Sequence, residues 1–162
     1  MEENTHQGII PSKKIVNKIK KKKSIEIVKG DPQFYMNEDI KRLSTPWSIA
    51  STRAKKIDVG KLPAGVILDP AAGSGVQLLA YSKELKRPTL GIELEKDIAE
   101  VCAANMEINS EEGVHRLLDR VLIGDGTDAE NAVTSYWSSL RENGNKAQPP
   151  IAMLHLDPAR PR

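Results

Sequence analysis

The chain has little cysteine and no long apolar run, and each shortage excludes a class of protein. Cys102 is the only cysteine among 162 residues, so an internal disulfide and a metal site built from several cysteines are both excluded. No apolar run approaches the roughly 20 residues that a membrane-spanning helix needs. The Lys-rich N-terminus is not followed by the apolar core of a secretion signal. We therefore expect a protein of a reducing, cytoplasmic compartment.

Metal-ligand spacing is also missing, so we expect no metal site. His115 and His155 stand alone in the sequence, which favours structural roles for both. Cys102 lies on the apolar face of a predicted helix, which is typical of a small core residue rather than of a nucleophile. The length is that of one domain, and the composition, 39% apolar and 28% charged, is ordinary for a globular chain.

The net charge is small but unevenly distributed. Residues 1–61 carry 14 Lys and Arg against 7 Asp and Glu, whereas residues 62–162 carry 10 against 15, which together make the net +2. A basic half suits contact with RNA, although a solvated helix is the simpler interpretation of 13–23 alone. We predict a basic N-terminal extension over 1–44, with disorder in 1–11, a helix over 12–23 and a short strand over 25–28.

From residue 45 onward the pattern predicts alternating helices and strands in a second unit, 45–162. Thr45-Pro46 predicts an N-cap and a first turn, and the apolar spacing that follows predicts a helix over 46–57. Apolar strands are expected at 65–68, 89–93, 120–123 and 151–156. The helices between them are expected at 75–86, at 97–108 and after a capping box at 127–130. This order predicts an α/β fold with parallel strands, right-handed crossovers and helices on both faces.

The most informative stretch is Asp69-Pro-Ala-Ala-Gly-Ser-Gly75, which follows the first of these strands. The second strand ends at Glu93, 18 residues after Gly75, so both stretches meet at one crevice where a nucleoside can lie. Leu78 stands where a dinucleotide site has its third glycine, and Asp69 would repel a pyrophosphate, which disfavours a nucleotide-dependent oxidoreductase. The crevice suits a ligand with a cationic end and no phosphate, such as S-adenosyl-L-methionine.

The same stretch resembles motif I of the class I S-adenosylmethionine-dependent methyltransferases, which have a Rossmann-like sheet. The resemblance implies that Asp69 holds the methionine amino group of S-adenosyl-L-methionine. It assigns Ala71, Gly73 and Gly75 to cofactor binding, the glycines because they let the backbone approach the ligand. It also implies that Glu93 accepts hydrogen bonds from the ribose hydroxyls.

Two later positions complete the implied site. Asp125, in Ile-Gly-Asp-Gly, matches the acidic residue that contacts the adenine amino group in that family. Asp157-Pro-Ala-Arg160 matches motif IV, which faces the methyl donor and the substrate, so Asp157, Pro158 and Arg160 are the candidate catalytic residues. Ala159 and Arg160 replace the proline and aromatic residue usual in amine-methylating enzymes, which leaves room for a phosphate contact by Arg160.

The segment 45–55 and the Asp-Pro-Ala-Arg tetrapeptide are similar to methyltransferases with a THUMP-like C-terminal domain, relatives of trimethylguanosine synthase. This resemblance covers about residues 40–162. The sheet of that family has more strands than this sequence predicts, so we hypothesise a truncated product or gene fragment. Its last predicted strand, 151–156, would be an apolar edge prone to self-association.

Several functions remain open from the sequence. RNA methylation is the first hypothesis, and methylation of a small molecule or a protein would use the same cofactor half. A non-catalytic nucleic-acid-binding module, with the basic extension as its surface, belongs to a different class. Each candidate residue also has a purely structural interpretation, as part of a tight turn, a helix cap, a strand end or a surface ion pair.

Overall fold

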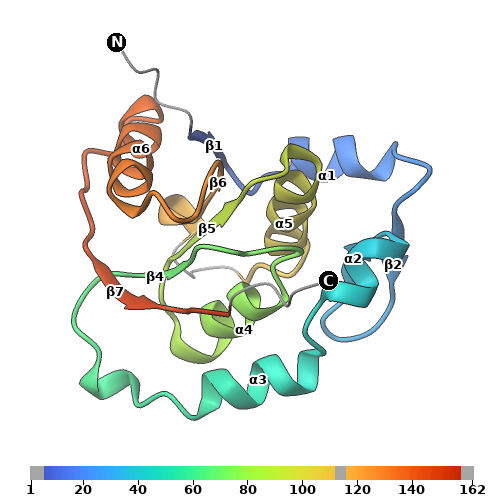
Figure 1. Cartoon of the computed structure of the whole chain (residues 1–162), viewed down its shortest axis with the longest axis horizontal. Coiled ribbons are helices and arrows are strands. Elements are labelled where there is room, and N and C mark those ends of the chain that lie inside the picture. The colour runs from blue at the N-terminus through green and yellow to red at the C-terminus, as the bar shows by residue number, and fades with distance from the viewer. Residues whose placement is uncertain (1–5, 112–115, 158–162) are drawn as a thin grey trace.

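The protein has an α/β fold, described here from a computed structural model that covers residues 6–111 and 116–157 (Figure 1). A mostly parallel sheet of five strands has the order β1-β6-β5-β4-β7. Its strands are β1 (Gln7–Ile9), β4 (Val66–Asp69), β5 (Thr89–Glu93), β6 (Arg120–Ile123) and β7 (Ile151–Leu154). A separate antiparallel pair joins β2 (Glu26–Val28) to β3 (Phe34–Met36).

The four strands predicted from residue 65 onward are all present and run parallel to one another. β4 lies between β5 and β7, with Ile67 opposite Thr89 on one side and Val66 opposite Ile151 on the other. β5 pairs in turn with β6, where Glu93 lies opposite Ile123. The chain therefore moves from β4 outward to β6 and then returns to β7 on the other side of β4. The carboxyl ends of all four strands share one edge of the sheet.

Helices cover both faces of this sheet. The helices are α1 (Lys13–Lys20), α2 (Glu38–Leu43), α3 (Trp47–Lys55), α4 (Val76–Leu85), α5 (Lys96–Ile108) and α6 (Ala129–Glu142), with short 3-10 turns at Val59–Lys61 and Arg116–Leu118. α4 and α5 cover one face, with α3 packed against α4 and α1 against α5, whereas α6 covers the other face (Figure 1). Right-handed crossovers explain this, because the connections to β5 and to β7 run in opposite directions across the sheet. No helix within the residues described is both long and apolar enough to cross a bilayer.

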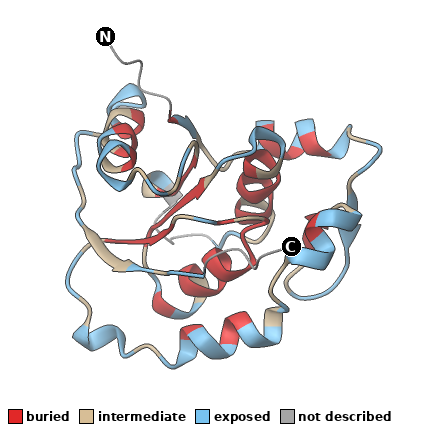
Figure 2. Cartoon of the chain, in the orientation of Figure 1, coloured by how far each residue is buried: buried red, intermediate tan, exposed pale blue. Residues whose placement is uncertain are grey.

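Successive side chains of each strand point to opposite faces of the sheet, so the hydrophobic core consists of two clusters, one on each face. Val66 and Leu68 of β4 face α6 and pack with its fully buried Tyr136, whereas Ile67 faces α4 and belongs to the other cluster. Figure 2 shows the result as buried strands between helices whose inner sides are buried. Gly91 faces α4, where an added Cβ would stand 2.9 Å from the Leu78 side chain, so this glycine lets α4 lie close to the sheet.

The N-terminal extension packs on the same core, and part of the prediction for it is wrong. Disorder was expected over 1–11, yet β1 pairs antiparallel with β6, with Gln7 opposite Ile123; residues 1–5 lie outside the described part. Three residues carry too short a pattern to predict a strand, and the partner that holds them is more than 100 residues away. The predicted helix is present as α1, whose Ile15, Val16 and Ile19 are buried. β2 was predicted, whereas its partner β3 was not.

Both predicted N-caps are wrong by one residue. The α3 cap position is Pro46, whose carbonyl accepts from the Ala50 N–H at 3.0 Å, and Thr45 precedes it. The α6 cap is Asp128. Thr127 does not cap that helix because its backbone N–H and its hydroxyl both donate to Asp125 Oδ1, at 2.9 and 2.7 Å.

Candidate functional site

The candidate site lies at the carboxyl edge of the sheet, between β4 and β7. These neighbours are joined to the rest of the chain in opposite directions, which makes the gap between them the switch point of the sheet, where ligands of open α/β sheets bind. Asp69 ends β4 and Glu93 ends β5, while Asp125 follows β6 and Asp157 follows β7. The structure therefore brings the four acidic residues singled out from the sequence to one edge.

The turn between β4 and α4 depends on two glycines. Gly73 and Gly75 have φ of +54° and +88°, in the left-handed region that favours glycine. An added Cβ at Gly75 would stand 2.9 Å from Cys102 Sγ, whereas one at Gly73 would meet nothing within 4 Å. Gly75 therefore serves packing between the turn and α5, while Gly73 borders open space. Cys102 is fully buried beneath the turn, where burial raises the pKa of its thiol, so its predicted structural role is confirmed.

Asp69 is a buried acid with few partners. Only 3% of its surface is exposed, and its Oδ1 accepts the N–H of Ala71 at 3.1 Å. The pKa of Asp69 is raised from 3.8 to about 7, mainly by burial and also by the nearby charges of Asp157 and Glu93, against the lowering effect of the hydrogen bond from Ala71. A buried carboxylate in this setting is stabilised in its ionised form by a cationic partner.

Glu93 and Asp125 are more accessible. Glu93 is half-buried, and burial raises its pKa against the opposing effect of the Leu94 N–H. Asp125 is exposed, and the hydroxyl and backbone N–H of Thr127 lower its pKa. Asp125 Oδ1 accepts both hydrogen bonds from Thr127, so Asp125 Oδ2 can accept a hydrogen bond from another donor.

The loop that carries Asp125 is fixed from two sides. His6 Nε2 lies 3.0 Å from the carbonyl oxygen of Asp125, and a Cβ on Gly124 would overlap the His6 ring. A Cβ on Gly126 would overlap the carbonyl oxygen of Pro70, which follows Asp69. The loops after β4 and β6 are therefore in contact, and His6, just before β1, packs against the β6 loop.

The end of β7 carries a second group of polar side chains. Asp157 Oδ2 lies 3.6 Å from Arg53 Nη1 of α3. His155 Nδ1 lies 2.7 Å from the hydroxyl of Tyr81 on α4, with the two rings edge to face. The His155 N–H donates to the carbonyl oxygen of Leu68 at 2.8 Å, so this group begins beside Asp69.

Sequence reasoning missed three of these residues. Arg53 and Tyr81 lie on helices that were predicted, yet nothing in the pattern gave either side chain a role. His155 was interpreted as structural, although its spacing of two from Asp157 in a strand-like segment was a usable signal. Pro158 and Arg160, the other candidate catalytic residues, lie outside the described residues.

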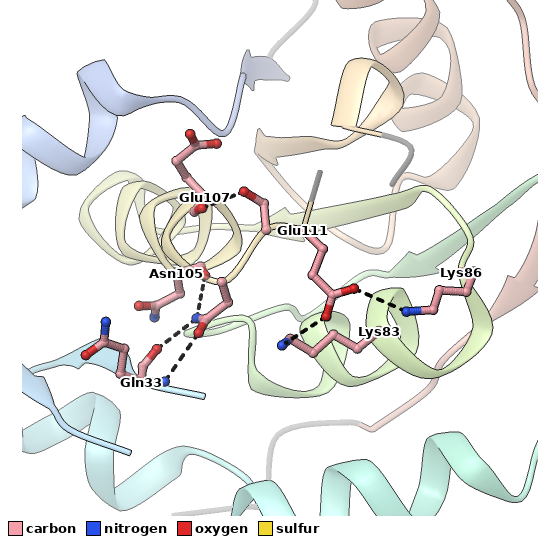
Figure 3. A network of polar contacts seen from close by, with 8 residues as sticks. Gln33, Lys83, Lys86, Asn105, Glu107 and Glu111 are labelled. Carbon is pink, nitrogen blue, oxygen red and sulfur yellow. Dashed lines mark hydrogen bonds and ion pairs between the residues drawn. The ribbon is translucent and has the colours of Figure 1, made fainter. Parts of the chain in front are cut away.

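A small hollow of about 20 Å³ lies elsewhere on the molecule and is not part of this site. It is lined by residues near the C-termini of α4 and α5 and by Asp119 before β6, so it lies at the amino edge of the sheet. Glu111 is one of its lining residues and pairs with Lys83 at 3.6 Å and with Lys86 at 3.3 Å; Figure 3 shows these two pairs. Over 6–111 and 116–157, no three His, Cys, Asp or Glu residues are grouped to hold a metal ion.

No protein-family model, curated protein or solved structure matches the chain. The function of the site is therefore inferred from its geometry and chemistry.

Proposed function

We propose that the chain binds S-adenosyl-L-methionine and is a methyltransferase of the class I type. The observation that carries this proposal is the position of Asp69: a buried carboxylate at the switch point of a parallel sheet, directly before a glycine turn. A phosphate-bearing ligand would meet this charge at close range, whereas an ammonium group would neutralise it.

The residues of the crevice fit the different parts of such a ligand. Asp69 suits the methionine ammonium, because pairing offsets the cost of ionising a buried acid. Gly73 borders open space over the turn, where a side chain would intrude on a bound ligand. Glu93 is half-buried at the end of the neighbouring strand, where a carboxylate accepts from two ribose hydroxyls, and Asp125 Oδ2 suits the adenine amino group.

The chemistry asked of the protein is mostly alignment. When bound, the sulfonium supplies a methyl group that is already activated. The chain then holds an acceptor atom in line with it and excludes water, which are effects of proximity and desolvation. Asp157 lies at the end of β7, where its carboxylate is held by Arg53 and is half-exposed to an incoming acceptor. The resemblance adds Pro158 and Arg160 to this acceptor side.

Calorimetric titration with S-adenosyl-L-methionine and with its demethylated product tests the cofactor. We expect Glu93→Ala to weaken binding at least about tenfold, as loss of hydrogen bonds to a charged group costs about 1.5–3 kcal/mol. Glu95→Ala is the matched control, since Glu95 is an exposed acid two residues away and its variant is expected to bind normally. Binding of NADH in place of both sulfur compounds would overturn the proposal.

RNA is the acceptor that the charge distribution favours. On and after α1, five lysines are exposed, namely Lys13, Lys14, Lys20, Lys21 and Lys23, whereas Lys18 and Lys22 pair with Glu100 and Asp97 of α5. The first five are therefore available to phosphates, and the other two hold the helix in place. A partly basic surface of this kind gives salt-dependent, sequence-tolerant binding.

Removing the exposed charges tests this acceptor. In the triple variant Lys20→Gln, Lys21→Gln, Lys23→Gln, we expect weaker RNA binding and a shallower salt dependence, by up to about three phosphate contacts. Affinity for the demethylated cofactor should stay unchanged. RNA binding by a chain that binds neither sulfur compound would favour the non-catalytic module, and labelled methyl transfer to a protein or small molecule but not to RNA would favour the other acceptor classes.

A further inference from the structure

The strongest feature that the proposed function leaves unused is the contact between Tyr81 and His155. Tyr81 is buried on α4, and its hydroxyl lies 2.7 Å from Nδ1 of His155 at the end of β7. The backbone N–H of His155 bonds to the carbonyl oxygen of Leu68, the residue before Asp69. The imidazole is therefore held at the switch point, on the side of β4 away from Glu93.

Charged and titratable groups face this ring from every element around it. Asp157 is two residues further along its own segment, Arg53 of α3 is paired with Asp157, and Asp69 ends β4 beside it. Burial lowers the pKa of His155, Arg53 lowers it too, and Asp157 opposes both. The imidazole is consequently neutral near pH 7 and has one nitrogen without hydrogen.

The other groups of the cluster are less able to take a proton. Burial and the charge of Asp69 raise the pKa of Tyr81, so its hydroxyl stays protonated. Asp157 is engaged by Arg53, and Asp69 is assigned to the ligand's ammonium group. His155 is the remaining base, and the Tyr81 oxygen is placed to accept from Nδ1–H, in the tautomer that leaves Nε2 as the acceptor.

We propose that His155, oriented by Tyr81, accepts the proton that the methyl acceptor releases, and that the acceptor atom therefore carries a hydrogen, as the nitrogen of an amino group does. This inference rests on the proposed function. The nitrogen lone pair forms the bond to the methyl carbon, and the carbon–sulfur bond breaks with its electron pair remaining on sulfur. The proton then leaves the methylated nitrogen for His155 Nε2, and the imidazolium formed is stabilised by the Asp157 carboxylate.

The position of His155 can be tested without knowing the acceptor, by NMR titration of the histidine rings in two complexes. One complex contains the demethylated cofactor, whose sulfur is neutral. The other contains the analogue in which a carbon bearing an ammonium group replaces the methylsulfonium. The chain has three histidines, and His155→Gln assigns the resonance of interest. We expect the His155 midpoint to be lower by about 0.5–1 pH unit with the ammonium analogue, because a positive charge then faces the ring.

His6, which contacts the carbonyl oxygen of Asp125 in the β6 loop, provides the internal reference resonance. Tyr81→Phe keeps the ring but removes the hydroxyl. In this variant the difference in the His155 midpoint between the two complexes should be smaller, because the imidazole loses the hydrogen bond that orients it. His155→Gln should bind the demethylated cofactor as the parent chain does, and should lose about 10²-fold in single-turnover methyl transfer to RNA together with the low-pH limb of the rate profile.

Equal His155 midpoints in the two complexes would overturn the inference and leave the cofactor proposal standing. A His155→Gln chain with the parent rate and pH profile would do the same. If neither compound binds, the cofactor proposal fails, and the role of His155 fails with it.

Discussion

The side-chain amide of Asn105 holds the backbone of Tyr35 as a neighbouring strand would. Its Oδ1 accepts the Tyr35 N–H at 2.6 Å, and its Nδ2 donates to the Tyr35 carbonyl at 3.1 Å. Asn109 holds Gln33 in the same way, at 3.3 and 2.8 Å (Figure 3). The match is geometric, because four residues of helix and two residues of strand both advance by about 6–7 Å.

Asn105 also links this strand to the candidate site. Its Nδ2 donates to the carbonyl oxygen of Ser74 at 2.9 Å, and the Ser74 hydroxyl lies 2.8 Å from that of Ser44. The glycine turn is thus held by α5 and by the N-terminal extension together. The basic extension therefore supports the turn that the proposed cofactor would contact.

The two asparagines predict a difference in stability. Asn105→Ala removes three buried hydrogen bonds and leaves the Tyr35 N–H unpaired, so it should cost about 2–4 kcal/mol of unfolding free energy. Asn109→Ala removes bonds that are only partly buried and should cost about 1 kcal/mol. Urea denaturation of both variants measures the difference, and equal costs would contradict the role given to Asn105.

The two glycines of the turn predict a similar contrast. Gly75→Ala combines a left-handed backbone with a Cβ placed 2.9 Å from Cys102 Sγ, and should cost about 3 kcal/mol or more. Gly73→Ala has the backbone cost without the clash, about 1–2 kcal/mol. In thermal unfolding, Gly75→Ala should therefore be the less stable of the two. Cofactor affinity should show the opposite order. Gly73→Ala should remain folded but bind the cofactor more weakly, because its added Cβ lies in the open space over the turn.

Asp69 predicts an unusual pH dependence of stability. A folded-state pKa of about 7 against 3.8 means that the folded state binds more protons between these values, so unfolding free energy falls as the pH rises from about 4 to 7. The full difference is worth about 4 kcal/mol. Asp69→Asn keeps an acceptor for Ala71 and should raise the melting temperature at pH 8 but not at pH 4.

The same variant should lose its ligand. Asn carries no charge for the proposed ammonium group, so the demethylated cofactor should raise the melting temperature of the parent chain and not that of Asp69→Asn. A variant that gains no stability at pH 8 would contradict the burial argument for Asp69.

Lys18 in α1 and Lys22 after it form the ion pairs that attach the extension to α5, and the two pairs should differ in their contribution to stability. Lys18 pairs with Glu100, whose side chain is 5% exposed, whereas Lys22 pairs with Asp97, whose side chain is 83% exposed. Lys18→Ala leaves a buried carboxylate without its cation and should cost about 1–3 kcal/mol. Lys22→Ala should cost less than about 0.5 kcal/mol. Chemical denaturation separates them, and adding Glu100→Gln to Lys18→Ala should recover part of the loss.

Much of the fold was predictable because its signals are local. The strands 89–93 and 120–123 match β5 and β6 to the residue, since each has a short apolar run, 90–92 or 121–123, next to polar residues. Gly73 and Gly75 were predicted because a tight turn between a strand and a helix needs residues with a positive φ, and Asp69 and Glu93 were singled out by their places at the ends of two predicted strands. β1 was missed because its strand partner β6 lies more than 100 residues away. β3 was also missed; it pairs with the nearby β2 and is held in addition by the distant side chain of Asn105.

The sequence by itself determined that this protein is an α/β chain with parallel strands, a glycine turn and acids at the strand ends, because such features follow from periodicity and residue type. Only the tertiary structure decided which side chains meet at the switch point. Arg53, Tyr81, His155 and Asp157 come from α3, α4 and the segment after β7, and no local pattern relates them. It also decided that Asp69 is buried deeply enough to raise its pKa, since burial depends on every element that closes around the carboxylate.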